Sequence, residues 1–119
     1  MTPTELEKKA AAEAIAWAHE TLELGYSEIG LAVEADERTV RRWEGQQVVP
    51  RGRHRGKLEE LRELRHLLKA VFETRAEADA WLHASVPAFR GRTPISLIRL
   101  GKLEAVINAL ATMEAGTYL

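Results

Sequence analysis

Apolar residues recur along this chain at steps of three and four positions, which is the period of an amphipathic helix. The first such stripe follows Thr2-Pro3-Thr4-Glu5, where a threonine cap, a proline at the first helical position and a glutamate three residues after the cap mark a helix start. The pattern predicts a helix from there to about Leu24, stopped by Gly25. Its mostly apolar stripe comprises Leu6, Ala10, Ala14, Trp17, Thr21 and Leu24.

The helical period returns in the later parts of the chain, and no segment alternates apolar and polar residues over the length of a strand. We therefore predict an all-α fold, with an N-terminal domain in residues 1–72 and a small helical module in residues 73–119. The later helices are expected at residues 27–33, 37–44 and 57–72, from Thr74 through Leu82, from Thr93 to Gly101 and from Leu103 to Gly116, with a loop rich in glycine and arginine at 45–56.

Length and composition permit one modest hydrophobic core and exclude several kinds of site. The chain has 119 residues, of which 45% are hydrophobic, so wholesale disorder is excluded. It has no cysteine, which excludes disulfides and thiol chemistry. No apolar run approaches the roughly 20 residues that cross a bilayer, and the N-terminus is charged, unlike a signal peptide. We expect a cytoplasmic protein with no membrane partner.

Catalytic and metal-binding motifs are absent from the sequence. The four histidines are scattered, and no nucleophile has a base at a recognisable spacing. The segment from Gly52 to Leu58 is similar to a phosphate-binding loop, but it is one residue short between its glycines and has Leu58 where a serine or threonine would hold Mg²⁺. We therefore predict a non-enzyme with no catalytic residues, no metal site and no cofactor.

The charge is nearly balanced overall but uneven along the chain. The net charge is −1, yet residues 1–37 carry two lysines against nine acidic residues, and residues 38–57 carry seven basic residues against Glu44 alone. The local net charges are −7 and +6. A neutral protein with one basic block has a defined place for an anion, and nucleic acid is the largest anion in the cytoplasm.

The first part of the basic block has the spacing of a helix-turn-helix. In residues 29–43, Gly30 is small enough for two helices to cross, and Val40 and Trp43 anchor the second helix. The polar residues of that helix then face outward, where a recognition helix meets the major groove. The loop cations repel one another without a polyanion, because no acid stands among them. The predicted DNA contacts are Arg38, Thr39, Arg41 and Arg42 on the helix and Arg51, Arg53, Arg55 and Lys57 after it.

Residues 29–43 resemble the helix-turn-helix of Xre-type regulators, in which a leucine-alanine pair opens the motif and an arginine-threonine-valine-x-arginine-tryptophan run forms the recognition helix. One position departs from the pattern. Glu34 stands where the family usually has a turn glycine, at a position that often needs positive φ. An alternative stays open, because helix-turn-helix shapes also serve as scaffolds, and the arginines then only solvate a surface.

The C-terminal part resembles the toxin-binding domain of Xre/MbcA/ParS antitoxins. The pattern runs from Trp81-Leu82 through Pro87 and the Gly91-Arg92-Thr93-Pro94 helix start to Leu100-Gly101, and it closes with a helix that ends at Gly116. The resemblance implies a toxin-binding module whose partner is a RES-domain toxin, an enzyme that consumes NAD⁺ and whose active site the module covers. We expect Trp81, Pro87, Phe89, Gly91, Thr93 and Pro94 to shape the module, and Arg92, Leu100, Leu103, Tyr118 and Leu119 to contact the toxin.

Three functional hypotheses follow from these features. The first is an antitoxin of a type II toxin–antitoxin system that neutralises a RES-domain toxin and represses its own operon by binding operator DNA, as a homodimer within a larger complex. The second is a dimeric helix-turn-helix transcriptional regulator without a toxin partner, whose C-terminal helices only dimerise it. The third is an inhibitor whose helix-turn-helix no longer binds DNA specifically.

Overall fold

The computed structural model describes residues 1–116, and within that range the chain is helical and forms no strand. The all-α prediction is confirmed. Within these residues, no helix combines the length and the apolar character needed to cross a membrane. The elements are α1 (Pro3–Glu20), α2 (Tyr26–Val33), α3 (Glu37–Glu44), α4 (Arg53–Val71), α5 (Arg75–Leu82), a 3₁₀ turn (Pro87–Phe89), α6 (Pro94–Arg99) and α7 (Leu103–Glu114).

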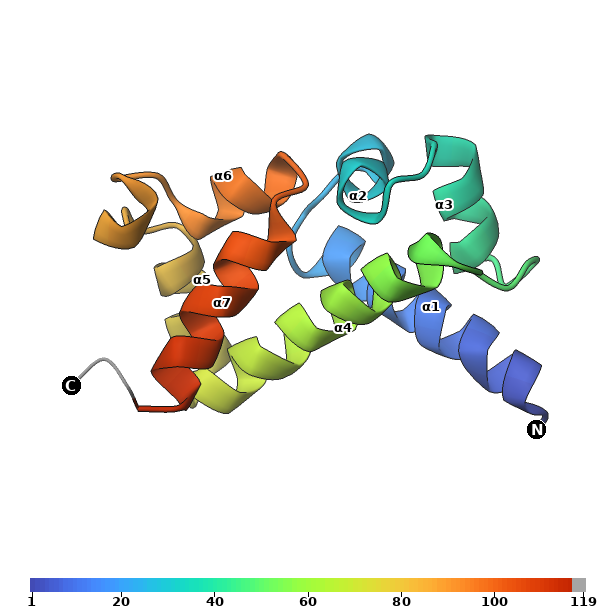
Figure 1. Cartoon of the computed structure of the whole chain (residues 1–119), viewed down its shortest axis with the longest axis horizontal. Coiled ribbons are helices and arrows are strands. Elements are labelled where there is room, and N and C mark those ends of the chain that lie inside the picture. Colours follow the sequence, from blue (N-terminus) through green and yellow to red (C-terminus); the bar gives the residue numbers. More distant parts are fainter. Residues whose placement is uncertain (117–119) are drawn as a thin grey trace.

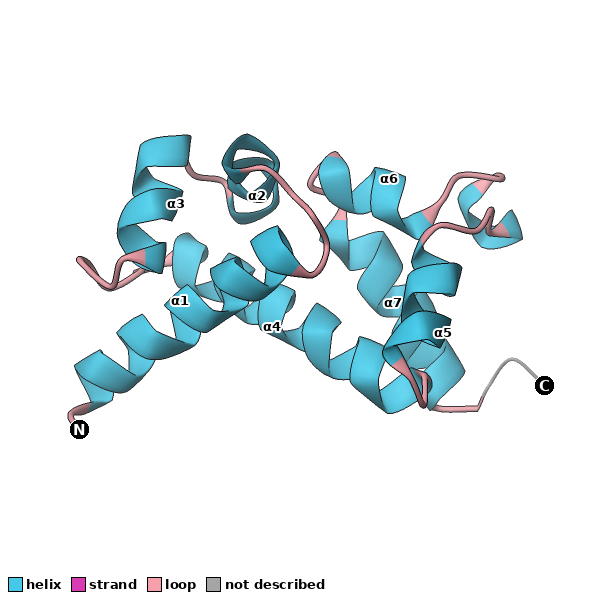
Figure 2. Cartoon of the chain, turned by 180° about the vertical axis from the view of Figure 1, so that it is seen from behind, coloured by secondary structure: helices cyan, strands magenta, loops and turns pink. Residues whose placement is uncertain are grey.

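The long helix α4 runs across the middle of the molecule, with α1, α2 and α3 gathered towards one end and α5, α6 and α7 towards the other (Figure 1). Helix α7 packs along α4, and α6 lies beside α2 at the junction of the two ends. The reverse view shows α1 crossing α4 (Figure 2). The molecule measures 43 × 27 × 25 Å, so this arrangement is elongated along α4.

One hydrophobic core extends through both ends of the molecule. Its members come from α1, α2 and α3, continue along α4, and end in α6 and α7. Helix α4 therefore contributes one buried stripe to two sets of neighbours, which requires leucine at nearly every inward position. The fully buried members of the hydrophobic core include Ile15, Leu24, Ile29, Val33, Val40, Leu61, Leu64, Ile98, Leu103, Val106 and Leu110.

Helix α1 ends at Glu20, four residues before the predicted end. The chain reverses after Thr21 so that Leu22 and Leu24 are both buried, and Glu23 takes a left-handed conformation with φ 58° to make this possible. Gly25 does not stop α1. It serves as the N-cap of α2, and its N–H donates to the Glu28 carboxylate at 2.9 Å.

Helix α4 begins at Arg53, four residues before the predicted start. Gly52 has φ 58° and ψ −133°, a backbone conformation open mainly to glycine, and it ends the preceding loop. The expectation that residues 45–56 form one loop is therefore wrong. Arg53, Arg55 and Lys57 lie on the first turns of a helix, where the helical backbone fixes their directions.

The helix starts predicted at Thr2, Thr74 and Thr93 are confirmed. Thr2 and Glu5 form a reciprocal capping box, with the Glu5 N–H donating to the Thr2 hydroxyl at 3.1 Å and the Thr2 N–H donating to the Glu5 carboxylate at 3.2 Å. Thr74 and Thr93 cap α5 and α6 through their hydroxyl oxygens. These local signals depend on neighbouring residues only, so they are readable without knowledge of the fold.

Candidate functional site

Helices α2 and α3 cross as closely as the helix-turn-helix pattern predicts. A Cβ placed on Gly30 would lie 2.4 Å from the carbonyl oxygen of Ala35, so no side chain fits there. The Ala35 N–H donates to the Gly30 carbonyl at 2.9 Å, which closes the turn. Val40 and Trp43 are buried and anchor α3. The helix-turn-helix geometry is therefore formed.

The turn between α2 and α3 forms without the glycine usual in the family that it resembles. Glu34 adopts the left-handed conformation itself, with φ 58° and ψ 43°. Its neighbours fix the turn from outside: a ring nitrogen of His54, Nδ1, lies 3.2 Å from the Val33 carbonyl oxygen, and the Lys57 ammonium lies 3.9 Å from the Glu34 carboxylate. The first turns of α4 therefore support the turn.

The predicted DNA contacts on α3 differ in exposure and in their intramolecular partners. Arg38 and Arg42 are exposed and form no ion pair within residues 1–116. Thr39 is half-buried, and its N–H donates to the Asp36 carboxylate at 2.7 Å. Hydrogen bonds from the Thr39 side chain and backbone hold the pKa of Asp36 below its ordinary value, so the cap of α3 is a carboxylate.

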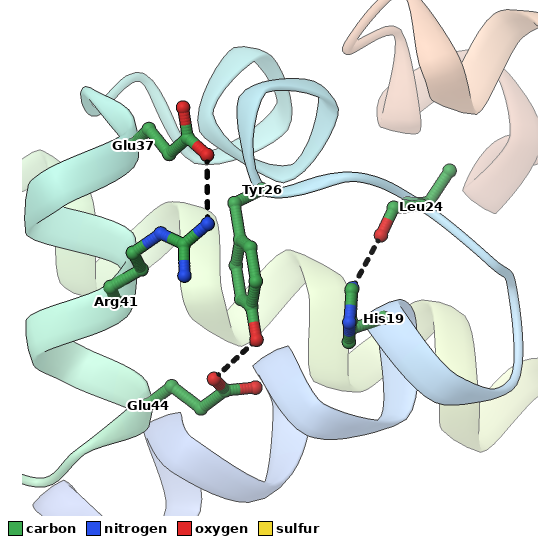
Figure 3. A network of polar contacts seen from close by, with 6 residues as sticks. All are labelled: His19, Leu24, Tyr26, Glu37, Arg41 and Glu44. Carbon is green, nitrogen blue, oxygen red and sulfur yellow. Dashed lines mark hydrogen bonds and ion pairs between the residues drawn. The ribbon is translucent and has the colours of Figure 1, made fainter.

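Arg41 is held by its own protein (Figure 3). Its guanidinium carbon lies 4.2 Å from the centre of the Tyr26 ring, and a guanidinium nitrogen lies 3.1 Å from the Glu37 carboxylate. This side chain remains more than half exposed, but a DNA contact by it competes with two intramolecular partners. The contact with Tyr26 could not be read from residue spacing, because Tyr26 belongs to a different helix.

Tyr26 is the centre of a cluster that joins the first three helices (Figure 3). His19 stacks on its ring with 4.4 Å between centroids, on the side away from Arg41. The Tyr26 hydroxyl donates to the Glu44 carboxylate at 2.7 Å. That hydrogen bond raises the pKa of Tyr26. The cluster fixes the orientation of α3 relative to α1 and α2, which is what a recognition helix requires.

The prediction that the cations after α3 stand without acidic neighbours is wrong for two of them. Arg55 lies 3.1 Å from the Glu7 carboxylate of α1, and it also pairs with Glu59 at 3.6 Å. Lys57 pairs with Glu60 at 3.4 Å as well as with the turn residue already described. The acids come from distant segments and from the next helical turn. Among residues 1–116, Arg51 and Arg53 are exposed and form no ion pair.

The C-terminal helices are docked directly on the helix-turn-helix. Gly101 has φ 80°, and a Cβ there would lie 2.8 Å from the carbonyl oxygen of Leu31 in α2. An ion pair crosses the same junction, with the Arg99 guanidinium 3.9 Å from the Glu28 carboxylate. The glycine that ends α6 therefore permits backbone-to-backbone contact, and α6 sits beside α2 as a result.

An exposed apolar patch lies at this junction. Leu100 is 54% exposed and Leu31 is 59% exposed, and Gly101 holds their two segments together. We call Leu31 and Leu100 the junction patch. Sequence reasoning selected Leu100 but missed Leu31, which sits inside the helix-turn-helix motif and has no other mark in the sequence. Exposed leucines on neighbouring elements are typical of a protein interface.

The other predicted toxin-contact residues have different environments. Arg92 is exposed. Leu103 is only 2% exposed, because the apolar positions of α7 face α4, so the expected direct contact does not fit its place in the core. Tyr118 and Leu119 lie outside the described residues. Trp81 packs between Phe72 and Phe89, with ring centroids 5.7 and 6.5 Å away, and shapes the module.

No group of three or more histidine, aspartate or glutamate side chains gathers in a metal-binding arrangement within the described part of the chain. The chemistry available at the surfaces described above is charge pairing, hydrogen bonding and apolar contact.

Comparisons with known proteins cover both the helix-turn-helix and the C-terminal helices. Residues 67–116 match the family described as the antitoxin Xre/MbcA/ParS C-terminal toxin-binding domain. The chain is 32% identical over 108 residues to the "Mycobacterial cidal antitoxin MbcA" of Mycobacterium tuberculosis H37Rv and of Mycobacterium bovis, covering 91% of this chain and 95% of each relative. The crystal structure of the M. tuberculosis MbcT–MbcA toxin–antitoxin complex matches with a TM-score of 0.57 and 31% identity, over 91% of this chain and 96% of that one.

Proposed function

This chain belongs to the Xre/MbcA/ParS family of antitoxins, and we propose that it is the antitoxin of a type II toxin–antitoxin pair. The observation that carries the proposal is the extent of the likeness. It covers 91% of the chain, and therefore both the helix-turn-helix and the C-terminal module, at 32% identity to a protein named as an antitoxin. The C-terminal module also matches a family described as a toxin-binding domain, which favours the antitoxin over a regulator whose C-terminal helices only dimerise it.

The partner in this proposal is a RES-domain toxin that consumes NAD⁺, and the antitoxin neutralises it by covering the active site. We assign this contact to the junction patch and to Arg92, which are exposed, and we keep Tyr118 and Leu119 as further candidate contacts. The two exposed leucines supply an apolar part of this contact, and the exposed Arg92 supplies a charged part.

The antitoxin also represses its own operon through α3 in this proposal. Arg38 and Arg42 are the leading base or phosphate contacts, since both are exposed and unpaired in the described chain, and Arg51 and Arg53 add phosphate contacts. Thr39, Arg41, Arg55 and Lys57 take secondary roles, because each has an intramolecular partner already. Operator half-sites related by a two-fold axis are matched by a homodimer.

The first test is co-purification of this chain with the product of the adjacent gene, followed by an assay of NAD⁺ consumption by that partner with and without the chain. We expect a tight complex without turnover. Leu100→Glu combined with Leu31→Glu should weaken inhibition at least about 100-fold, because a charge is placed in a desolvated contact. Ala70→Glu, the same kind of change at an exposed position of α4, is the control and should inhibit normally.

Each failure in this assay removes a defined part of the proposal. A partner that binds but consumes no NAD⁺ removes the RES-type activity, and unchanged inhibition by the leucine variants removes the junction patch. If no complex forms, the chain acts as a helix-turn-helix regulator alone.

The second test is binding of the complex to the promoter across a range of salt concentrations. Arg38→Glu with Arg42→Glu should abolish specific binding and leave toxin inhibition intact, whereas Arg55→Glu, whose native partners are acids of the same chain, should have a smaller effect. Normal repression by the first variant would mean that α3 does not read the operator.

A further inference from the structure

The ring of Tyr26 is fixed on one face and at its hydroxyl (Figure 3). The His19 ring stacks on the face away from Arg41, with 4.4 Å between centroids and 19° between the ring planes. His19 is itself held, since its Nδ1 lies 2.8 Å from the Leu24 carbonyl oxygen. The Tyr26 hydroxyl donates to the Glu44 carboxylate at 2.7 Å. The ring therefore presents its other face in one fixed direction, towards Arg41.

Arg41 is bound to that face. Its guanidinium carbon lies 4.2 Å from the centre of the Tyr26 ring, and a guanidinium nitrogen lies 3.1 Å from the Glu37 carboxylate. The ring attracts the cation through the negative charge of its face, and the carboxylate holds the end of the same side chain by a charge-assisted hydrogen bond. The Arg41 side chain is 58% exposed, yet two partners on α2 and α3 restrain it.

The other arginines of α3 are not restrained by an acid. Arg38, Arg41 and Arg42 line one open surface hollow of about 470 Å³, whose remaining walls are Glu37 and Gln47. Within residues 1–116, Arg38 and Arg42 form no ion pair. Arg41 thus lies among the cations assigned to DNA contact, on the same surface and with the same charge. It differs from them in being held by a tyrosine of another helix and by a carboxylate.

An unrestrained cation on a DNA-binding surface strengthens binding to any sequence, because every nucleotide carries a phosphate. On unrelated DNA the protein can shift along the duplex until each free cation meets a phosphate. At an operator the base contacts fix the position of the helix, so a further cation gains a contact only where a phosphate lies within its reach. Restraining one cation therefore lowers affinity mainly for unrelated DNA, which supplies nearly all competing sites in a genome.

We propose that Tyr26 is a specificity-determining residue of the helix-turn-helix, whose ring withholds Arg41 from the DNA backbone and so weakens binding to DNA of unrelated sequence. This inference rests on the proposed function, in which α3 meets operator DNA. The ring contact at an exposed site is worth roughly a 2- to 5-fold change in an equilibrium constant. The role of Tyr26 is therefore a modest and measurable gain in selectivity, exerted without a contact between Tyr26 and DNA.

The test compares Tyr26→Leu with Tyr26→Phe. Both substitutions remove the hydroxyl that donates to Glu44, but only the leucine removes the ring that holds Arg41, and neither changes the net charge. Binding of the full chain to a promoter duplex and to an unrelated duplex is measured by fluorescence anisotropy over a range of salt concentrations. Tyr26→Met, a second variant without a ring, should agree with Tyr26→Leu.

We expect Tyr26→Leu to lower the Kd for the unrelated duplex roughly 2- to 5-fold relative to the wild type. The slope of log Kd against log salt should steepen by up to about 0.9, the value for one further phosphate contact. The ratio of the two Kd values, unrelated over promoter, should fall, because the promoter gains less. Tyr26→Phe keeps the ring and should retain the wild-type Kd and salt slope on the unrelated duplex.

The matched control repeats the leucine substitution in an Arg41→Gln background, where the ring has no cation to hold. Tyr26→Leu should then leave the Kd for the unrelated duplex unchanged, a result that a general loosening of α3 would not give. The inference is overturned if the leucine and phenylalanine variants bind the unrelated duplex equally, or if the leucine acts as strongly without Arg41 as with it.

The proposed function fails in a different way in the same experiment. A wild type that binds promoter and unrelated DNA equally removes operator reading, and with it the selectivity assigned to Tyr26. The comparison on the unrelated duplex still decides whether the ring withholds Arg41. A wild type that binds neither duplex, with Tyr26→Leu equally inactive, removes both the DNA contact of α3 and this inference.

Discussion

At the scale of single residues, the turn between α2 and α3 shows a conformation that the sequence does not favour. Glu34 has φ 58°, in the left-handed region where a side chain is strained and glycine is not. The Lys57 ammonium, 3.9 Å away on the surface, offsets little of that strain. The turn is therefore imposed by the packing of its neighbours and not by its own preference.

Glu34→Gly should stabilise the fold by roughly 0.5–1 kcal/mol in urea denaturation, because the strain disappears. Glu63→Gly is the matched control. It makes the same chemical change in the right-handed interior of α4, where glycine should destabilise by about 1 kcal/mol. Equal destabilisation by both substitutions would show that position 34 is not strained.

Two further glycines should respond oppositely to alanine. Gly30→Ala brings a Cβ to 2.4 Å from a backbone oxygen, which neither helix can move away from cheaply, so the free energy of unfolding should fall by more than about 2 kcal/mol. Gly56→Ala lies within α4 with open space around it and should stabilise by about 0.5–1 kcal/mol. Thermal unfolding of the two variants decides the point, and a tolerated alanine at position 30 would contradict the close crossing.

At the scale of elements, the N-cap of α3 makes the stability of the helix-turn-helix depend on pH. Asp36 has a lowered pKa because Thr39 donates to its charged form. A carboxylate of this kind stabilises the fold above its ordinary pKa of about 3.9, and the contribution is lost as pH falls through the lower, folded-state pKa.

Asp36→Ala should therefore lower the unfolding midpoint near pH 7, and its difference from the wild type should narrow as the pH falls through the lowered pKa of that carboxyl. Asp36→Asn keeps a capping oxygen without a titrating group, so its stability relative to alanine should not vary over this interval. Urea denaturation of the three proteins along a pH series measures this. A wild-type advantage that persists in acid would mean that the cap does not act through its charge.

The sequence predicts the elements well where signals are local and poorly where they depend on packing. The caps at Thr2, Asp36 and Thr74 were readable because each acts over three residues. The end of α1 was not, because burying Leu22 and Leu24 overrides the continuing helical period. The acids that neutralise the basic residues of α4 also come partly from other segments, which residue spacing cannot reveal.

Among the candidate site residues, too, those set by local requirements could be predicted and those that depend on packing could not. Gly30 was identifiable as the crossing residue because only its size matters there. Leu103 was misassigned because an apolar residue at the start of a helix fits either a core or an interface, and only the position of α7 against α4 decides. Leu31 and the Tyr26 cluster depend on contacts between helices, so the sequence could not single them out.

At the scale of the whole molecule, the two predicted domains share one core. The division at residue 72 falls just after α4, whose leucines contact both α1 and α7. The close contact between Gly101 and Leu31 joins the two parts a second time. Whether each part folds alone is a question about cooperativity, and the continuity of the core favours a single unit.

A cavity in α7 should therefore loosen the helix-turn-helix as well. Leu110 is fully buried, and Leu110→Ala should cost about 2–5 kcal/mol. If the chain unfolds as one unit, amide protons in α2 and α4 that exchange only by global unfolding should lose protection by the same free energy as those in α7. Leu100→Ala makes the same change at an exposed position and should have an effect below about 1 kcal/mol. Unchanged protection in α2 would instead mean that residues 1–72 are stable independently, and the proposed binding to DNA and the proposed binding to toxin could then be tested on separate fragments.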